Sequence, residues 1–105
     1  MYSLEDIKSR SESPDELVLS YTDAMELLDI FGQNGVQVLG WEGWIKYSDG
    51  RLGHSSKHQG TVDLGNLPIQ SAIAIAKLAI MQSNGEWELH PEAENASLFF
   101  CLTTG

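Results

Sequence analysis

Apolar and polar side chains alternate most clearly between Leu39 and Tyr47. With a period of two, one face would carry Leu39, Trp41, Ile45 and Tyr47, with Gly43 as a gap, and the other Glu42, Trp44 and Lys46. This pattern is typical of a strand with one face in the core, so we expect Trp41 to be buried. Trp44 shares its face with two charges and requires cover from another element or a partner. Glycines flanking Glu42 would allow close backbone approach, which we expect at Gly43.

A helix is predicted before this strand. Ser20 and Asp23 can form a capping box, and Gly35 is a typical helix end. The apolar residues between them recur at the spacing of one helical face: Ala24, Leu27, Leu28 and Phe31. The opposite face carries an acidic stripe of Asp23, Glu26 and Asp29, which fits a solvated surface and is also a candidate binding surface. Residues 16–20 fit a short strand or the first turn of this helix.

Polar segments lie at the N-terminus and after the tryptophan-rich strand. Residues 1–15 contain several serines and Pro14, which favours a turn and a mobile lead-in. The turn signal Ser48-Asp49-Gly50 predicts a hairpin, with an extended segment running back from Arg51. Residues 53–65 are rich in glycine and serine, and we expect them to form a surface loop.

The last third of the chain predicts a second helix and two more strands. Pro68 suits the first turn of a helix, and apolar residues on both sides of the following segment predict that this helix is buried. Asn84-Gly85 indicates a turn into an alternating strand over residues 86–89. After a polar loop over residues 91–96, the continuous apolar run over residues 97–103 favours a central strand.

These elements predict an α+β fold of one domain. The 105 residues suffice to bury a hydrophobic core without disulfides. We expect a polar lead-in over residues 1–15 and a single domain over residues 16–105. That domain should contain a mostly antiparallel sheet of four or five strands, with two main helices on one face.

Charge narrows the possible partners. The chain has 15 acidic and 6 basic residues, a formal charge of −9, which disfavours nucleic acid and favours a basic partner. The apolar run from Ile69 to Met81 is too short to span a membrane and contains Lys77. The first ten residues lack the apolar core of a secretory signal, so we expect a cytoplasmic protein.

Few residues suggest catalysis. His54 and His58 have a spacing that could bind zinc on a helix, but they fall in a predicted loop without a further ligand, so we expect no metal or cofactor. Cys101 lies in an apolar run and should be inert. There is no nucleophile elbow or phosphate-binding loop. Glu42, Asp49 and His54 could converge in space as an acid and base group. An alternative function is therefore a small enzyme or ligand-binding regulatory domain built on the loop over residues 49–60.

Three segments of the sequence carry a resemblance to a known class of proteins. They are the run from Val38 to Ile45 with its Gly-Trp-Glu-Gly-Trp core, the segment from Asp49 to Ser55, and the ending Phe99 to Thr103. Over about residues 20 to 103 the chain resembles small immunity proteins of bacterial polymorphic-toxin and contact-dependent growth inhibition systems. The resemblance implies a cytoplasmic inhibitor, without enzyme activity, that binds the C-terminal domain of a toxin encoded beside it.

The resemblance and the charge together predict how this chain would act. A nuclease toxin carries a basic surface for its substrate, which an acidic inhibitor can occlude. The sequence does not say which toxin is bound. The expected partner-binding residues are the acidic stripe, the carboxylates near the hairpin, and Trp44 as anchor: Asp23, Glu26, Asp29, Glu42, Asp49 and Trp44.

Overall fold

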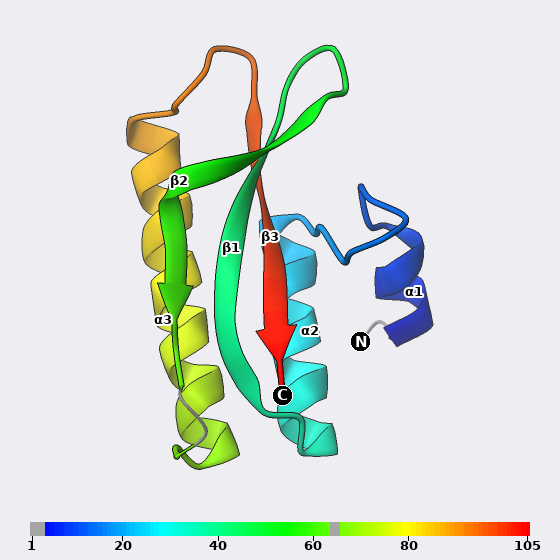
Figure 1. The fold of residues 1–105 in the computed structure, drawn as a ribbon, viewed down its shortest axis with the longest axis vertical. Coiled ribbons are helices and arrows are strands. Elements are labelled where there is room, and N and C mark those ends of the chain that lie inside the picture. The colour runs from blue at the N-terminus through cyan, green and yellow to red at the C-terminus, as the bar shows by residue number, and fades with distance from the viewer. Residues whose placement is uncertain (1–3, 64–65) are drawn as a thin grey trace.

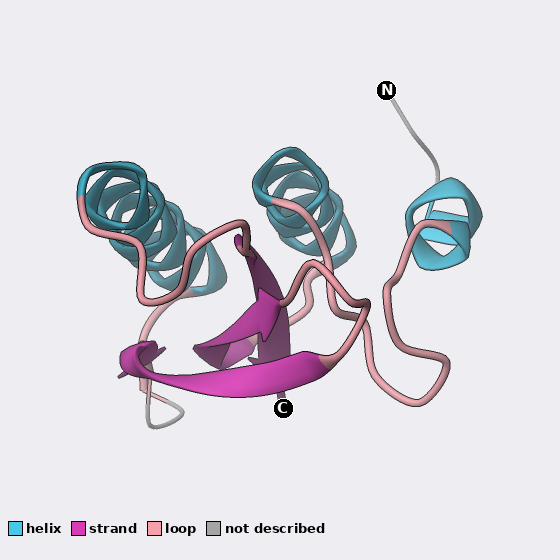
Figure 2. Cartoon of the chain, turned by 90° about the horizontal axis from the view of Figure 1, so that it is seen from above, coloured by secondary structure: helices cyan, strands magenta, loops and turns pink. Residues whose placement is uncertain are grey.

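The computed structural model describes residues 4–63 and 66–105, which form an α+β domain. The elements are α1 (Leu4–Ser9), α2 (Tyr21–Asn34), β1 (Val38–Lys46), β2 (Leu52–Thr61), α3 (Ile69–Leu89) and β3 (Ser97–Thr104) (Figure 1). Figure 2 shows that the helices lie in one layer on the same side of the sheet. The predicted fold class is therefore confirmed. The sheet in the described residues has three strands, so the expected four or five are not present there.

The strand order is β2-β1-β3, and both pairings are antiparallel. The tryptophan-rich strand β1 is therefore central and β3 lies at an edge, so the prediction of a central strand over residues 97–103 was wrong. The backbone of Leu19 exchanges two hydrogen bonds with Phe100 of β3, at 2.7 and 2.8 Å, in an isolated bridge. Of the two alternatives for residues 16–20, the bridge favours a short strand over the first turn of the helix. It also satisfies backbone hydrogen-bonding groups of Phe100 on the outer edge of β3.

Helix α2 has the predicted ends. The Ser20 side chain accepts a hydrogen bond from the backbone N–H of Asp23 at 3.2 Å. Gly35 closes the helix in the left-handed conformation, with φ of 68°, which glycine adopts without steric cost. Leu27 and Leu28 are buried in the core that α2 forms with the sheet and α3.

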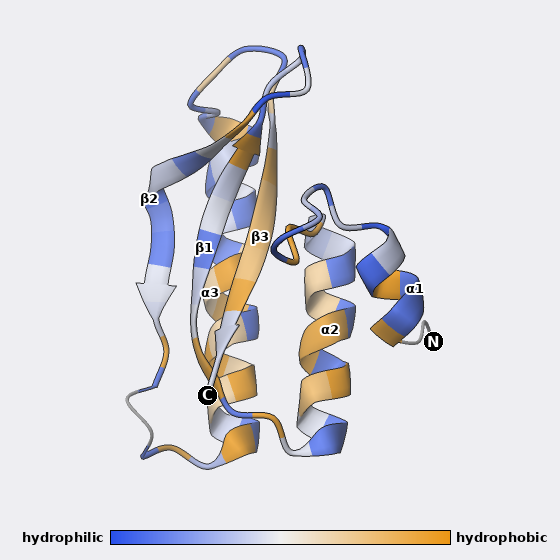
Figure 3. Ribbon diagram, turned by 45° about the vertical axis from the view of Figure 1, so that its right-hand side comes forward, coloured by the Kyte–Doolittle hydropathy of each residue, from blue (hydrophilic) through white to orange (hydrophobic). Residues whose placement is uncertain are grey.

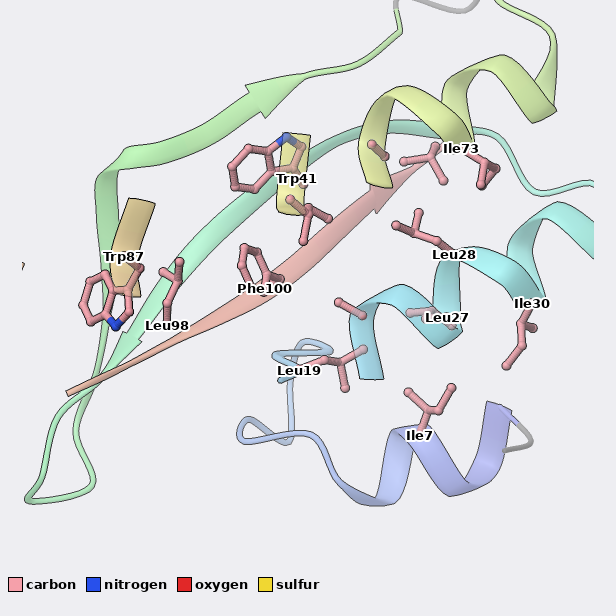
Figure 4. Packing of buried hydrophobic residues seen from close by; sticks show 14 of the residues in the cluster. Ile7, Leu19, Leu27, Leu28, Ile30, Trp41, Ile73, Trp87, Leu98 and Phe100 are labelled. Atoms are coloured by element: carbon pink, nitrogen blue, oxygen red, sulfur yellow. The ribbon is translucent and has the colours of Figure 1, made fainter. Parts of the chain in front are cut away.

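Helix α3 continues through Asn84-Gly85 to Leu89, so the predicted turn and the strand over residues 86–89 were wrong. The reason lies in Trp87, seven residues after Ile80 and therefore on the same helical face. Both side chains are buried in the core, and Trp87 packs near Leu98 (Figure 4). Tertiary burial thus outweighs the local turn preference of Asn84-Gly85.

The N-terminal segment is also more ordered than expected. Residues 4–9 form α1, and its Ile7 is fully buried against the core (Figure 4). Arg10, just after α1, forms two hydrogen bonds of 2.9 Å with the carboxylate of Asp23. One apolar side chain and one ion pair therefore dock a segment that is polar on average.

The core lies between the sheet and the helices. Trp41 packs on Phe100, with ring centroids 6.0 Å apart, in the middle of the buried side of the sheet. Figure 3 shows apolar residues concentrated in α2, α3 and β3, whereas β2 is mainly hydrophilic. The side of the sheet opposite the helices is the surface that carries the candidate site (Figure 2).

Candidate functional site

The outward residues of β1 align with their cross-strand partners on the side of the sheet away from the helices. Glu42 pairs with Cys101 of β3 and Gln59 of β2, and Trp44 pairs with Phe99 of β3 and His54 of β2. Directly paired residues share one face of a sheet. We call the set formed by Glu42, Trp44, Lys46, His54, Gln59, Phe99 and Cys101 the open sheet face.

Trp44 lies at the centre of the open sheet face, half-buried. Its ring packs against His54, with centroids 4.1 Å apart and planes at 45°. Its indole Nε1 is buried and has no hydrogen-bond partner among the described residues. The cover that the sequence required for Trp44 therefore comes from a neighbouring strand, and the remaining part of the indole stays accessible.

Glu42 and His54 meet beside Trp44, as the sequence allowed. The His54 Nδ1 lies 3.3 Å from the Glu42 carboxylate, and the two side chains are 64% and 44% exposed. Asp49 does not join them, because its carboxylate binds Arg51 at the hairpin turn with a 2.7 Å ion pair. The backbone N–H of Arg51, followed by its side chain, lowers the pKa of Asp49. The predicted acid and base group is thus reduced to Glu42 and His54.

An open hollow of about 900 Å³ adjoins Glu42. Its lining includes Glu42 and Gln59 of the open sheet face together with Gly40, Gly60 and Leu39. The chain is tightly packed at the two glycines, since a Cβ on Gly40 would lie 2.8 Å from the Gly60 carbonyl oxygen and a Cβ on Gly60 would lie 3.0 Å from the Trp41 Nε1. Among the described residues the hollow combines an apolar floor with the partly exposed carboxylate of Glu42.

The acidic stripe of α2 is only in part a solvated surface, because the side chain of Asp29 is 44% exposed whereas Asp23 is buried. Asp23 is 8% exposed and binds Arg10, and Asp29 forms an ion pair with Lys77 of α3. Glu26 is partly buried, and its Oε2 has no hydrogen-bond partner among the described residues. Asp23 and Asp29 therefore hold neighbouring segments in place. Lysine at position 23 would face Arg10 and destabilise the fold, so charge reversal there is not a clean test of binding.

His58 lies in strand β2 and not in the surface loop that was expected over residues 53–65, so that expectation was wrong for residues 53–61, and residues 64 and 65 lie outside the described part of the chain. The pairing of β1 with β2 steps from Gln59 opposite Glu42 to His54 opposite Trp44. Residues 55–58 therefore lie opposite the single residue Gly43 and form a large, irregular bulge. A Cβ on Gly43 would lie 2.6 Å from the His58 carbonyl oxygen, so the predicted close backbone approach at Gly43 is confirmed.

The bulge turns His58 toward the end of α3. Its side chain is almost fully buried, and its Nδ1 lies 3.1 Å from the Ser83 hydroxyl. Its Nε2 has no hydrogen-bond partner and lies 3.9 Å from the carboxylate of Glu92, which accepts a hydrogen bond from Ser55. The one sequence signal for this arrangement is Gly43, which leaves the room that the bulge occupies.

The two histidines point in opposite directions, His54 outward and His58 inward. In the part of the chain that the structure describes, no three His, Cys, Asp or Glu side chains come together as a metal site.

Cys101 lies half-buried on the open sheet face. Burial, assisted by the charges of Glu16 and Glu42, raises the pKa of the Cys101 thiol to about 11. This thiol is a poor nucleophile at neutral pH.

The predicted partner-binding residues thus separate into three places. Glu42 and Trp44 lie together on the open sheet face, Asp49 lies at the hairpin turn, and the acidic stripe is largely engaged within the helical layer. Within the described residues no helix is long and apolar enough to cross a membrane.

Comparison of the chain with family models, with curated proteins and with solved structures finds no match in any of the three.

Proposed function

We propose that this domain is an immunity protein that binds a basic toxin domain, a nuclease, through its open sheet face. The observation that carries the proposal is the position of Trp44, a partly accessible indole on the side of the sheet that the helices leave uncovered, next to Glu42. Interface residues that dominate affinity are often tryptophans surrounded by contacts that exclude water.

The distribution of charge supports a basic partner. In the described structure, four of the six basic residues form ion pairs with the chain's own carboxylates: Arg10, Lys46, Arg51 and Lys77. The formal charge of −9 is therefore not offset by a separate basic surface. A field of this sign raises the association rate of a basic partner by about 10–10³ over a neutral pair.

The hollow beside Glu42 suits a lysine or arginine of the toxin. Its floor at Gly40 and Gly60 can take the aliphatic part of such a side chain, while Glu42 can receive the cationic end. Trp44 would contact the same partner, because Glu42 and Trp44 are adjacent outward positions of β1. Binding here would cover the toxin surface that holds its substrate and so prevent activity.

Co-expression tests the function. The partner to test is the C-terminal toxin domain expected from a neighbouring upstream reading frame. Its expression should arrest growth of a bacterial host, and simultaneous expression of this chain should restore growth. Arrest that persists despite a soluble, folded chain, with no binding between the purified proteins, would contradict the proposal.

Binding variants test the surface. Trp44→Ala should weaken affinity roughly 30-fold, as expected for a residue worth about 2 kcal/mol. Glu42→Lys should slow association, whereas Asp49→Lys, with the same charge change at the hairpin turn, should slow it much less. Surface plasmon resonance at two salt concentrations measures both rates. Unchanged kinetics in Trp44→Ala and Glu42→Lys would remove the open sheet face as the toxin site.

The alternative, a small enzyme or ligand-binding regulatory domain using residues 49–60, draws support from the hollow of about 900 Å³. Glu42 connects this hollow to His54, although His54 is not among its lining residues. A small ligand in the hollow should raise the melting temperature of the parent. Thr61→Trp, which places a bulky side chain in the lining of the hollow, should abolish that rise. A thermal-shift screen with a metabolite collection distinguishes this function from toxin binding.

A further inference from the structure

The outward side of α3 is apolar, although the sequence predicted that this helix would be buried on all sides. Ile75, Leu78 and Met81 are 44%, 52% and 50% exposed, and Leu89 is more exposed still. With Ser71 and Gly85 they form a line with spacings of three or four residues, which we call the outer stripe. The charged residues of α3 fall beside this line, not on it. Such a patch on a highly charged protein marks an interaction surface.

The position of α3 places this stripe on the side of the helix away from the core. Helix α3 forms one end of the helical layer, with α2 on its inner side (Figure 1 and Figure 2). Its buried residues, among them Ala76, Ile80 and Trp87, face the core. The outer stripe lies on the opposite side of the helix, where its large side chains are about half exposed or more.

The outer stripe has a symmetric order of side-chain sizes about Leu78. Three residues away on either side are the large Ile75 and Met81, and seven residues away are the small Ser71 and Gly85. An antiparallel pair of α3 helices with its two-fold axis at Leu78 would place each residue opposite one of similar size. A two-fold interface requires this self-complementarity.

Charge favours the same antiparallel arrangement. Helix α3 has no acidic residue in its first turn and no basic residue in its last, and Glu86 and Glu88 flank the C-terminal part of the stripe. In an antiparallel pair these carboxylates lie over the partner's helix N-terminus, where the backbone N–H groups carry partial positive charge. A parallel pair would instead bring four carboxylates together at two negative helix ends.

We propose that the outer stripe of α3 binds a second copy of this chain, forming an antiparallel, two-fold symmetric dimer. The stripe from Ser71 to Leu89 is about 27 Å long at 1.5 Å per residue. A single helix pair of this length is smaller than a standard interface of about 800 Å² per partner, so the dimer should be weak and form at high micromolar concentrations. The proposal is independent of the toxin proposal because the open sheet face lies on the other side of the sheet.

Sedimentation equilibrium of the purified chain from about 5 to 500 μM tests the dimer. The parent should change from monomer to dimer over this range. Two chains of charge −9 repel, so added salt should strengthen the dimer by screening, whereas binding of a basic partner weakens with salt. Leu78→Glu should raise the dimer dissociation constant at least tenfold. Gln59→Glu, which adds the same charge on the open sheet face, should leave it within twofold.

Disulfide trapping tests the orientation, in a Cys101→Ser background. Oxidation should cross-link Ser71→Cys combined with Gly85→Cys, while Ser71→Cys alone should stay uncross-linked. The two positions are about 21 Å apart along one helix, too far for an internal disulfide. A parent that stays monomeric at 500 μM, or a dimer unaffected by Leu78→Glu in chains shown by circular dichroism to be folded, would overturn the proposal. Efficient cross-linking of Ser71→Cys alone would overturn the antiparallel arrangement.

Discussion

The two faces of β1 carry the same kind of residue in opposite roles. Trp41 is buried against Phe100 in the core, whereas Trp44, three residues later, lies on the open sheet face against His54. Gly43, on the inward face between them, makes room for the bulge of β2 that buries His58. One short motif therefore builds the core and the candidate site together, because adjacent residues of a strand point to opposite sides.

The two tryptophans should therefore differ most in stability. Trp41→Ala removes a large core side chain and should lower the free energy of unfolding by about 3–5 kcal/mol. Trp44→Ala removes a partly exposed ring with an unpaired N–H and should cost about 1 kcal/mol or less. Urea unfolding followed by far-UV circular dichroism measures both. Equal losses would show that the open sheet face is as important to the fold as the core.

Gly43 and Gly85 form a second pair, because Gly43 is tightly packed and Gly85 is not. Gly43→Ala places a methyl group where the His58 carbonyl lies and should cost about 1–3 kcal/mol through overpacking. Gly85→Ala is the matched control, because a Cβ there meets no atom within 4 Å in an exposed part of α3. That change should stabilise the protein by about 0.5–1 kcal/mol through helix propensity. Denaturant midpoints check both signs, and a Gly43→Ala protein as stable as the parent would contradict the tight bulge.

The histidines provide a third pair. His58→Ala leaves a small cavity beside Trp87 and an unpaired Ser83 hydroxyl, and it should cost about 1–3 kcal/mol. His54→Ala removes an exposed ring and should change stability by less than about 0.5 kcal/mol. Thermal unfolding of the two variants beside the parent gives the difference. If His54→Ala is the more damaging change, the stacking on Trp44 is structural.

The smallest effect concerns Cys101. Its pKa is raised from 9.0 to about 11, chiefly by burial, so the thiolate fraction at pH 8 is about 100-fold lower than for an ordinary cysteine. Iodoacetamide should modify the folded protein correspondingly slowly, and Glu42→Gln should accelerate the reaction by removing a nearby negative charge. Because the folded pKa is raised, the stability that the neutral thiol contributes is complete below pH 9 and is lost as the pH rises toward 11. Alkylation as fast as in urea would show that the thiol is not protected.

Much of the local structure could be predicted because it depends on short-range patterns. The ends of α2 follow from the Ser20 hydroxyl and the conformational freedom of Gly35, and the hairpin after β1 follows from Ser48-Asp49-Gly50. The buried position of Trp41 and the close approach at Gly43 follow from period-two alternation in β1. Of the candidate site, Glu42 and Trp44 could be assigned to one face for the same reason.

Other features depend on contacts between distant residues. The acidic stripe read as solvent-exposed because its cations, Arg10 and Lys77, come from separate segments. Burial of Trp87 carries α3 through Asn84-Gly85, although local preference favours a turn there. The position of β3 at an edge depends on which strand pairs with β1, which composition does not reveal.

Residue patterns alone were enough to predict the ends and period of α2, the alternation of β1 and the turn after it, and the composition gave the strong negative charge. Only the folded chain reveals which carboxylates are neutralised, which side of α3 stays uncovered, and that His58 is buried while His54 is not. The difference arises from how far along the chain each kind of interaction acts. Backbone preferences and alternation act within a few residues, whereas ion pairing and burial depend on which segments the completed fold brings together.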